Sequence, residues 1–257
     1  MVKRTLLTLT VCLAATALFW AYFHYVGELS LTGRKGCVCN GVNIILTGSE
    51  SDRSVNLNEL EGILRSRAVG RNTDSIDLLS IEMELQQMGE VLAAEAFASS
   101  PDSISVCITQ RKPVVRFVME DGSYYSDENC FLFPARNPAR IPVVTGKIPI
   151  KLEPGYKGHP SYESYIWTKR MIGLAQSIEN DSFLRNNIQQ IDVEGNGSLV
   201  MYPDLGDCRF IFGQCEGIPE KLEKIKVYYK GIAPVKDAGY YRTVDIEYKN
   251  QIICRQK

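Results

Sequence analysis

The chain has 257 residues, 45% of them hydrophobic, and its 29 basic residues nearly balance its 30 acidic ones. This length suffices for one or two domains with cores of their own, and the composition excludes a disordered chain. No block of basic residues stands out, so the sequence gives no sign of nucleic-acid binding.

The N-terminus indicates a membrane anchor. A short basic tail, residues 1–4, precedes an uncharged stretch, residues 5–26, that is long enough to cross the hydrocarbon core of a bilayer. Aromatic residues crowd the far end of this stretch, as at the outer interface of a membrane. The positive charges place the tail in the cytoplasm and everything after the linker 27–35 outside it. The alternative is a signal peptide cleaved at Ala17, but the apolar stretch continues past that site, which favours the anchor.

Residues 36–112 have the pattern of a small α+β domain. Apolar periodicity predicts a strand, two helices and two further strands, over residues 42–46, 57–64, 81–88, 91–99 and 103–109. A β-α-α-β-β order of this kind places both helices on one face of a sheet.

Residues 113–257 read as a β-rich domain with flanking helices. Strands are expected over residues 114–119, 123–126, 130–133, 141–145, 188–193, 199–202 and 208–212. Helices are expected over residues 161–178 and 219–230.

The last segment, Thr243–Cys254, alternates apolar and polar residues almost without a break, which predicts one long half-buried strand. The free edge of such a strand can pair with an extended segment of another chain. Alternatively, the charges of Asp245, Glu247 and Lys249 protect the edge from pairing. The residues alone leave both interpretations open.

The helix over residues 219–230 is expected beside this strand. Its lysines are expected to be exposed, and they either meet acidic residues of a partner or form a solvated face. The lysines concerned are Lys221, Lys224 and Lys226.

No catalytic, cofactor-binding or metal-binding set is recognisable. The chain has only two histidines, His24 and His159, and it lacks a Gly-x-Ser-x-Gly elbow, an HExxH motif and a P-loop. Seven of its eight cysteines follow the anchor, without the spacing of a zinc site. We therefore expect a protein that binds and does not catalyse.

Several stretches together resemble the bacterial cell-division family FtsQ, also called DivIB. Gln110–Pro113 is similar to the junction that closes the family's POTRA domain, and Gly122–Asp127 to its hairpin. Ile141–Gly146 matches its P-V-(V/I)-x-G stretch, and Tyr248–Cys254 resembles the YxNQVVC ending of the Bacteroidota branch. The chain departs from the pattern at Asn129, where many relatives have glycine and where we expect a left-handed turn. Its cysteine content is also higher than usual.

The resemblance implies a non-enzymatic divisome scaffold without cofactors, in the cell inner membrane at the septum, with both domains periplasmic. Such proteins bind FtsB/FtsL-type proteins and other divisome proteins and help recruit and regulate septal peptidoglycan synthesis. Strand addition at the C-terminus then identifies the expected partner-binding residues, which are Tyr248, Lys249, Asn250, Gln251 and Ile252, with Lys221 and Lys224.

By the same resemblance, residues 36–112 form a POTRA-like domain, either a second binding module or a rigid spacer, and residues 113–257 the FtsQ-type β domain. Other classes stay open: a periplasmic binding protein or enzyme released by signal cleavage, or a POTRA component of outer-membrane assembly. Components of the last kind usually carry several POTRA repeats, and this chain shows no internal repeat.

Overall fold

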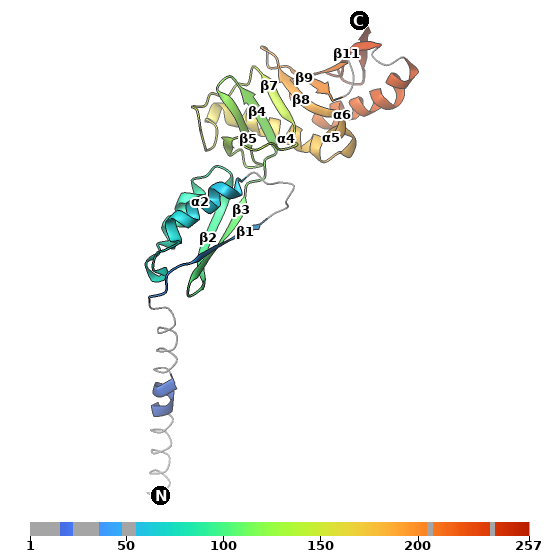
Figure 1. The fold of residues 1–257 in the computed structure, drawn as a ribbon. Helices are drawn as coiled ribbons and strands as arrows, with labels where there is room; N and C mark the ends of the chain where they lie inside the picture. The colour runs from blue at the N-terminus through green and yellow to red at the C-terminus, as the bar shows by residue number, and fades with distance from the viewer. Residues whose placement is uncertain (1–15, 23–35, 48–54, 205–207, 237–239, 257) are drawn as a thin grey trace, which may run out of the picture. The chain divides into compact units, whose positions relative to one another are not determined.

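A computed structural model describes residues 16–22, 36–47, 55–204, 208–236 and 240–256 (Figure 1). The predicted tail and linker lie outside these ranges, as does most of the predicted anchor; residues 16–22 are helical with exposed side chains. Within the described ranges, no helix combines the length and apolar character needed to span a membrane.

The chain divides into two compact units. The first contains the segments up to Leu46, 57–85 and 93–108, and the second contains the remainder, chiefly 109–257. Together they form an α+β protein, in which a small sheet with helices precedes a larger sheet with helices. The expected boundary between Lys112 and Pro113 stays a prediction.

The first unit is built on a three-stranded sheet in the order β1-β3-β2. Its elements are β1 (Gly41–Thr47), α2 (Leu57–Ala68), η2 (Thr73–Ser75), α3 (Leu78–Gln86), β2 (Val91–Ser100) and β3 (Ser103–Gln110). The apolar stripes of α2 and α3 are buried, as are alternate residues of β3, so the helices and the sheet share a core. This is the predicted order of elements.

The second unit is built on a nine-stranded mixed sheet in the order β12-β11-β10-β9-β8-β7-β4-β5-β6. Its strands are β4 (Val115–Met119), β5 (Gly122–Ser126), β6 (Leu132–Pro134), β7 (Val143–Gly146), β8 (Ile188–Val193), β9 (Leu199–Pro203), β10 (Arg209–Gly213), β11 (Tyr241–Asp245) and β12 (Ile253–Gln256). Neighbours β4 and β7, β7 and β8, and β10 and β11 run parallel, and the other adjacent pairs run antiparallel.

Helices pack against this larger sheet. They are α4 (Tyr162–Glu179), α5 (Ser182–Asn187) and α6 (Ile218–Val227), which continues through η3 (Tyr228–Ile232) and η4 (Ala233–Val235). Helix α4 contacts β4, α5 and α6, and α5 contacts β8. Buried apolar residues from these helices and from the strands form one core cluster, which includes Met171, Leu174, Leu222 and Ile225. The α6 end of this core is rich in aromatic contacts. The rings of Phe210 and Tyr228, for example, meet edge to face, with their centroids 5.5 Å apart.

The turn after β5 corrects one expectation. The left-handed residue there is Cys130, with φ 62°, whereas Asn129 is not among the residues with positive φ. The Asp127 carboxylate explains the shape of the turn, because its Oδ1 accepts hydrogen bonds from the backbone N–H groups of Asn129 and Phe131, each at 2.9 Å. This double cap fixes Asn129 in an ordinary conformation and moves the left-handed position one residue on.

The prediction of one long strand at the C-terminus is wrong. The segment forms two antiparallel strands, β11 and β12, joined by a turn in which Asn250 has φ 60°. Asparagine tolerates this left-handed conformation better than most residues, so it ends the extended run. The apolar residues on both sides of the turn still reach the core, which is why the alternation continues across it.

Candidate functional site at the C-terminal sheet edge

The C-terminal end of the larger sheet is the candidate site. Within the described part of the chain, strand β12 is the last in the sheet order and has a strand neighbour on one side only, β11. Asp245 lies opposite Ile253, and Val244 lies opposite Cys254. Because successive N–H groups of a strand point to opposite sides, part of the β12 backbone is directed away from β11. In Figure 1 the chain ends beside β11.

The side chains of β12 divide the edge into an apolar half and a polar half. Cys254 is half-buried and packs against the core. Ile253 is also half-buried and, by strand alternation, points to the opposite face. Arg255 and Gln256 are exposed. The edge therefore offers some apolar surface next to a charge.

The turn between β11 and β12 contains the residues that the sequence singled out. Tyr248, Lys249, Asn250 and Gln251 are exposed, and half of the Tyr248 side-chain surface is accessible. Ile252 is half-buried against the core. These residues come together with α6, but they occupy a turn and not an edge strand. Strand β12, the element able to pair, lies just after them.

The expectation of exposed lysines is wrong for Lys221 and Lys224, which are each only 9% exposed. Lys221 Nζ donates to the Gln214 carbonyl at 2.8 Å and lies 4.8 Å from the centre of the Phe212 ring. Burial lowers the pKa of the Lys221 ammonium, an effect that Glu247 opposes. Long lysine stems cover apolar surface while their ammonium groups reach nearby carbonyls, so neighbours of the apolar stripe become buried.

Lys224 fastens the turn to α6. Its ammonium donates to the Ile246 carbonyl at 3.3 Å and to the Tyr248 carbonyl at 2.5 Å, and it lies 3.3 Å from a carboxylate oxygen of Glu220. Glu220 also accepts the Asn250 backbone N–H at 3.4 Å. The hydrogen bond from Lys224, followed by that from Asn250, lowers the pKa of the Glu220 carboxyl. The remaining lysine of this helix, Lys226, pairs within the same unit with Asp181 at 3.1 Å and with Glu223 at 2.6 Å.

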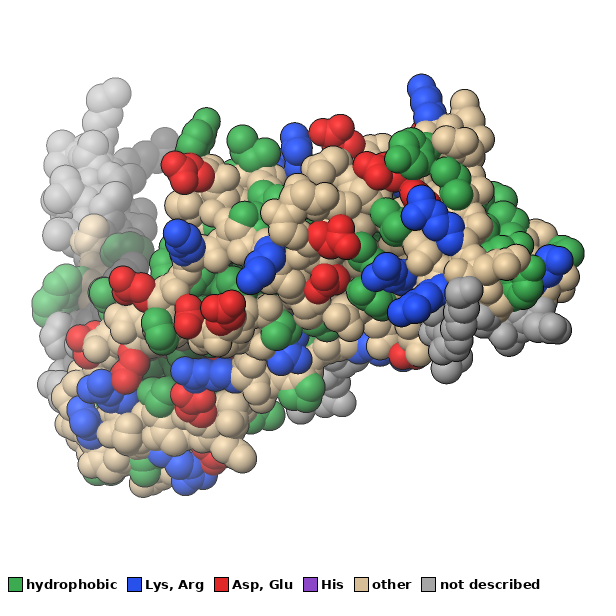
Figure 2. Space-filling model, turned by 90° about the horizontal axis from the view of Figure 1, so that it is seen from above, with side chains coloured by type: hydrophobic (Ala, Val, Ile, Leu, Met, Phe, Trp, Pro, Cys, Tyr) green, Lys and Arg blue, Asp and Glu red, His purple; other side chains and the backbone are tan. Residues whose placement is uncertain are grey.

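Beside the turn is a shallow hollow of about 350 Å³. Its charged lining is balanced, with the three lysines Lys221, Lys224 and Lys249 against the three carboxylates Glu216, Glu220 and Glu247. The left-handed Gly213, with φ +72°, directly precedes the lining residue Gln214, and a Cβ at Gly213 would lie 2.5 Å from Cδ of Glu247. On the face in Figure 2, basic and acidic side chains are likewise interspersed. Because positive and negative side chains are balanced at this edge, it favours a partner with a complementary arrangement of charges over ligands of a single charge sign.

Sequence reasoning missed two groups here. The first is β12 as the pairing element: the expected long strand included Ile253, but the partner-binding residues named from it ended at Ile252, and Arg255 and Gln256 lay beyond that strand. The second is Glu220, whose carboxylate joins Lys224 to the turn. Its position four residues before Lys224 on a helix was a signal for their ion pair, but not for the contact with Asn250.

Comparison with known proteins identifies a related protein family. A family model described as FtsQ/DivIB, C-terminal related, matches residues 112–255, which is more than half of the chain. The matched region includes α6, the turn and nearly all of β12. No curated protein matches the chain. The chain belongs to the FtsQ/DivIB C-terminal-related family.

Proposed function

We propose that this protein is a non-enzymatic scaffold of the bacterial division machinery, and that β12 binds an extended segment of an FtsB/FtsL-type protein. The observation that carries the proposal is the position of β12 at the sheet edge, inside the region related to FtsQ/DivIB. Strand addition supplies affinity through backbone hydrogen bonds and specificity through alternate side chains. Ile253 and the exposed ring of Tyr248 offer apolar contacts to such a segment.

The same proposal places the protein in its cell. Residues 5–26 anchor it in the inner membrane, with residues 1–4 in the cytoplasm and the folded units in the periplasm at the septum. Residues 36–112 serve as a POTRA-like module that binds other divisome proteins. The support is the basic, then apolar and aromatic order of the N-terminal sequence, together with the family relation.

A pair of proline variants in the full chain tests the strand addition. Arg255 and Gln256 are both exposed and adjacent, so their N–H groups point to opposite sides of β12. Proline removes the donor at either position. We expect the proline that removes an N–H directed at β11 to lower the melting temperature. The proline that removes an outward N–H should weaken capture of FtsB/FtsL-type proteins and leave the melting temperature unchanged.

Arg255→Ala and Gln256→Ala are the matched controls, because they remove the side chains and keep the donors. If both proline variants fold and bind these partners at full strength, strand addition at β12 is wrong. The edge is then a protected one.

A further inference from the structure

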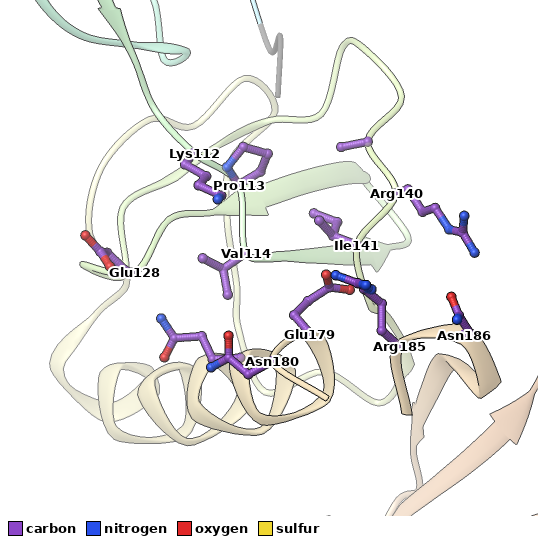
Figure 3. Close-up of a pocket in the computed structure, with 12 residues that line it drawn as sticks. Lys112, Pro113, Val114, Glu128, Arg140, Ile141, Glu179, Asn180, Arg185 and Asn186 are labelled. Atoms are coloured by element: carbon purple, nitrogen blue, oxygen red, sulfur yellow. The ribbon is translucent and has the colours of Figure 1, made fainter. Parts of the chain in front are cut away.

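The second unit contains a larger hollow far along the sheet order from β12. It measures about 680 Å³ and lies among the segment just before β4, the turn after β5, the loop before β7, the end of α4, and α5 (Figure 3). Its volume falls in the range of sites that hold a small ligand or a few peptide residues. Several chain segments converge here, so the hollow is formed by the fold and not by one flexible loop.

Five charged side chains line the hollow. They are the cations Lys112, Arg140 and Arg185 and the carboxylates Glu128 and Glu179. The surplus of one positive charge matches a monoanion, whereas the two carboxylates would repel a dianion such as phosphate. Arg140 and Arg185 are exposed, so their guanidinium groups are accessible to a ligand.

Glu179 occupies the centre of this arrangement. In Figure 3 its carboxylate and the guanidinium of Arg185 point toward one another within the hollow. Burial raises the pKa of the Glu179 carboxyl, and the positive charges of Arg185, Arg140 and Lys112 act in the opposite direction. The Glu179 carboxylate thus takes the position at which these cations would bind the carboxylate of a ligand.

The rest of the lining suits a peptide. Pro113, Val114 and Ile141 provide an apolar wall. The amide side chains of Gln176, Asn180 and Asn186 provide donors and acceptors that match a peptide backbone. A planar guanidinium binds a carboxylate through two parallel hydrogen bonds, which gives the charged end of such a ligand a defined orientation.

We propose that this hollow binds a short peptide segment of a partner protein through one of its carboxylates, held by Arg140 and Arg185. Glu179, whose carboxylate lies beside the Arg185 guanidinium in the free protein, competes with the incoming carboxylate. The site shares no residue with the β12 edge, so the two can be tested separately.

The test uses the full chain and two fluorescent peptides, Gly-Val-Glu-Val-Gly and Gly-Val-Gln-Val-Gly, both with blocked ends. Fluorescence anisotropy should show roughly tenfold tighter binding of the glutamate peptide, as expected for charge-assisted hydrogen bonds. Arg140→Gln and Arg185→Gln should each remove most of this preference. Arg170→Gln, which makes the same charge change on an exposed part of α4 outside the hollow, should keep it.

Glu179→Gln separates competition from simple charge attraction. It should tighten binding of the glutamate peptide severalfold, and more than Glu163→Gln, which removes an exposed carboxylate elsewhere on α4. Equal affinity for the two peptides, or equal effects of the hollow and control variants, overturns the proposal. Displacement of the peptide by inorganic phosphate at lower concentration than by acetate overturns the assignment of a carboxylate. Neither result bears on binding at β12.

Discussion

The ammonium group of Lys224 donates a hydrogen bond to the carbonyl of Tyr248 across 24 positions of sequence. The same ammonium reaches the Ile246 carbonyl, so one buried cation holds both ends of the Ile246–Tyr248 segment. Helix α6 therefore determines where the chain leaves β11 and, through the turn, where β12 begins.

Lys224→Met tests this contact. Methionine keeps the apolar stem but leaves carbonyls near the helix without their donor, which should cost about 2 kcal/mol of unfolding free energy. Urea denaturation of the full chain measures this loss. Lys169→Met, at an exposed position of α4, is the control and should change stability little. Equal stability of the two variants would show that the turn holds its shape without the lysine.

Asp181 should give the second unit a pH-dependent contribution to stability. Its side chain caps α5 by accepting the N–H groups of Phe183 and Leu184 at 3.0 and 3.1 Å. The hydrogen bond from Leu184, followed by that from Lys226, lowers the pKa of the Asp181 carboxyl. The unfolded chain then binds the proton more readily, so the stabilisation is present above the ordinary aspartate pKa and is lost as the pH falls through the lowered one.

Asp181→Ala should accordingly cost about 1 kcal/mol at neutral pH, as for other helix N-caps, and progressively less in acid. Urea denaturation at a series of pH values gives the curve, with the exposed Asp204→Ala as the matched control. A cost that stays constant below the pKa of Asp181 would contradict the capping role of the charged form.

The thiol of Cys215 should react slowly with alkylating agents. Burial raises its pKa to about 11, against smaller opposite effects of Arg170 and Lys221. Because the thiolate is the reactive form, alkylation by iodoacetamide at neutral pH should be much slower in the folded chain than in urea, where the pKa returns to its ordinary value. Mass spectrometry of the peptide that contains Cys215 measures both rates. Similar rates would show that the thiol is not buried in solution.

The fold was largely predictable because its helices and central strands have clear apolar periods. Core positions such as Leu60 and Leu64 in α2, or Ile104 and Ile108 in β3, follow from spacing alone. The burial of Lys221 and Lys224 was not predictable, since the carbonyls that accept from Lys224 belong to a segment more than twenty positions away.

The apolar alternation of the sequence could not reveal the terminal hairpin, for a geometric reason. Next to the turn, residues opposite one another in β11 and β12, such as Val244 and Cys254, have the same parity in the sequence; only the outermost pair, Tyr241 and Gln256, departs from this, at a register shift. Folding back at the turn therefore keeps the even-numbered residues Val244, Ile246, Ile252 and Cys254 on the core face, as a single straight strand would. Alternation cannot separate the two arrangements, and only the turn residue distinguishes them.

Asn250 provides that distinction experimentally. Its φ of 60° is accessible to glycine and strained for a β-branched residue, so Asn250→Gly should leave stability nearly unchanged while Asn250→Val should cost about 1–2 kcal/mol. The contact with Glu220 uses the Asn250 backbone N–H and survives both changes. In one continuous strand the order would be reversed, because valine is favoured over glycine there.

The same pair of substitutions at the neighbouring Gln251, which is exposed and not among the residues with positive φ, is the control. Glycine should not be preferred at that position. Thermal and urea denaturation of the four variants in the full chain measure the preference at each site. If Asn250→Val proves more stable than Asn250→Gly, the long edge strand is restored and, with it, Tyr248–Ile252 as the strand available to a partner.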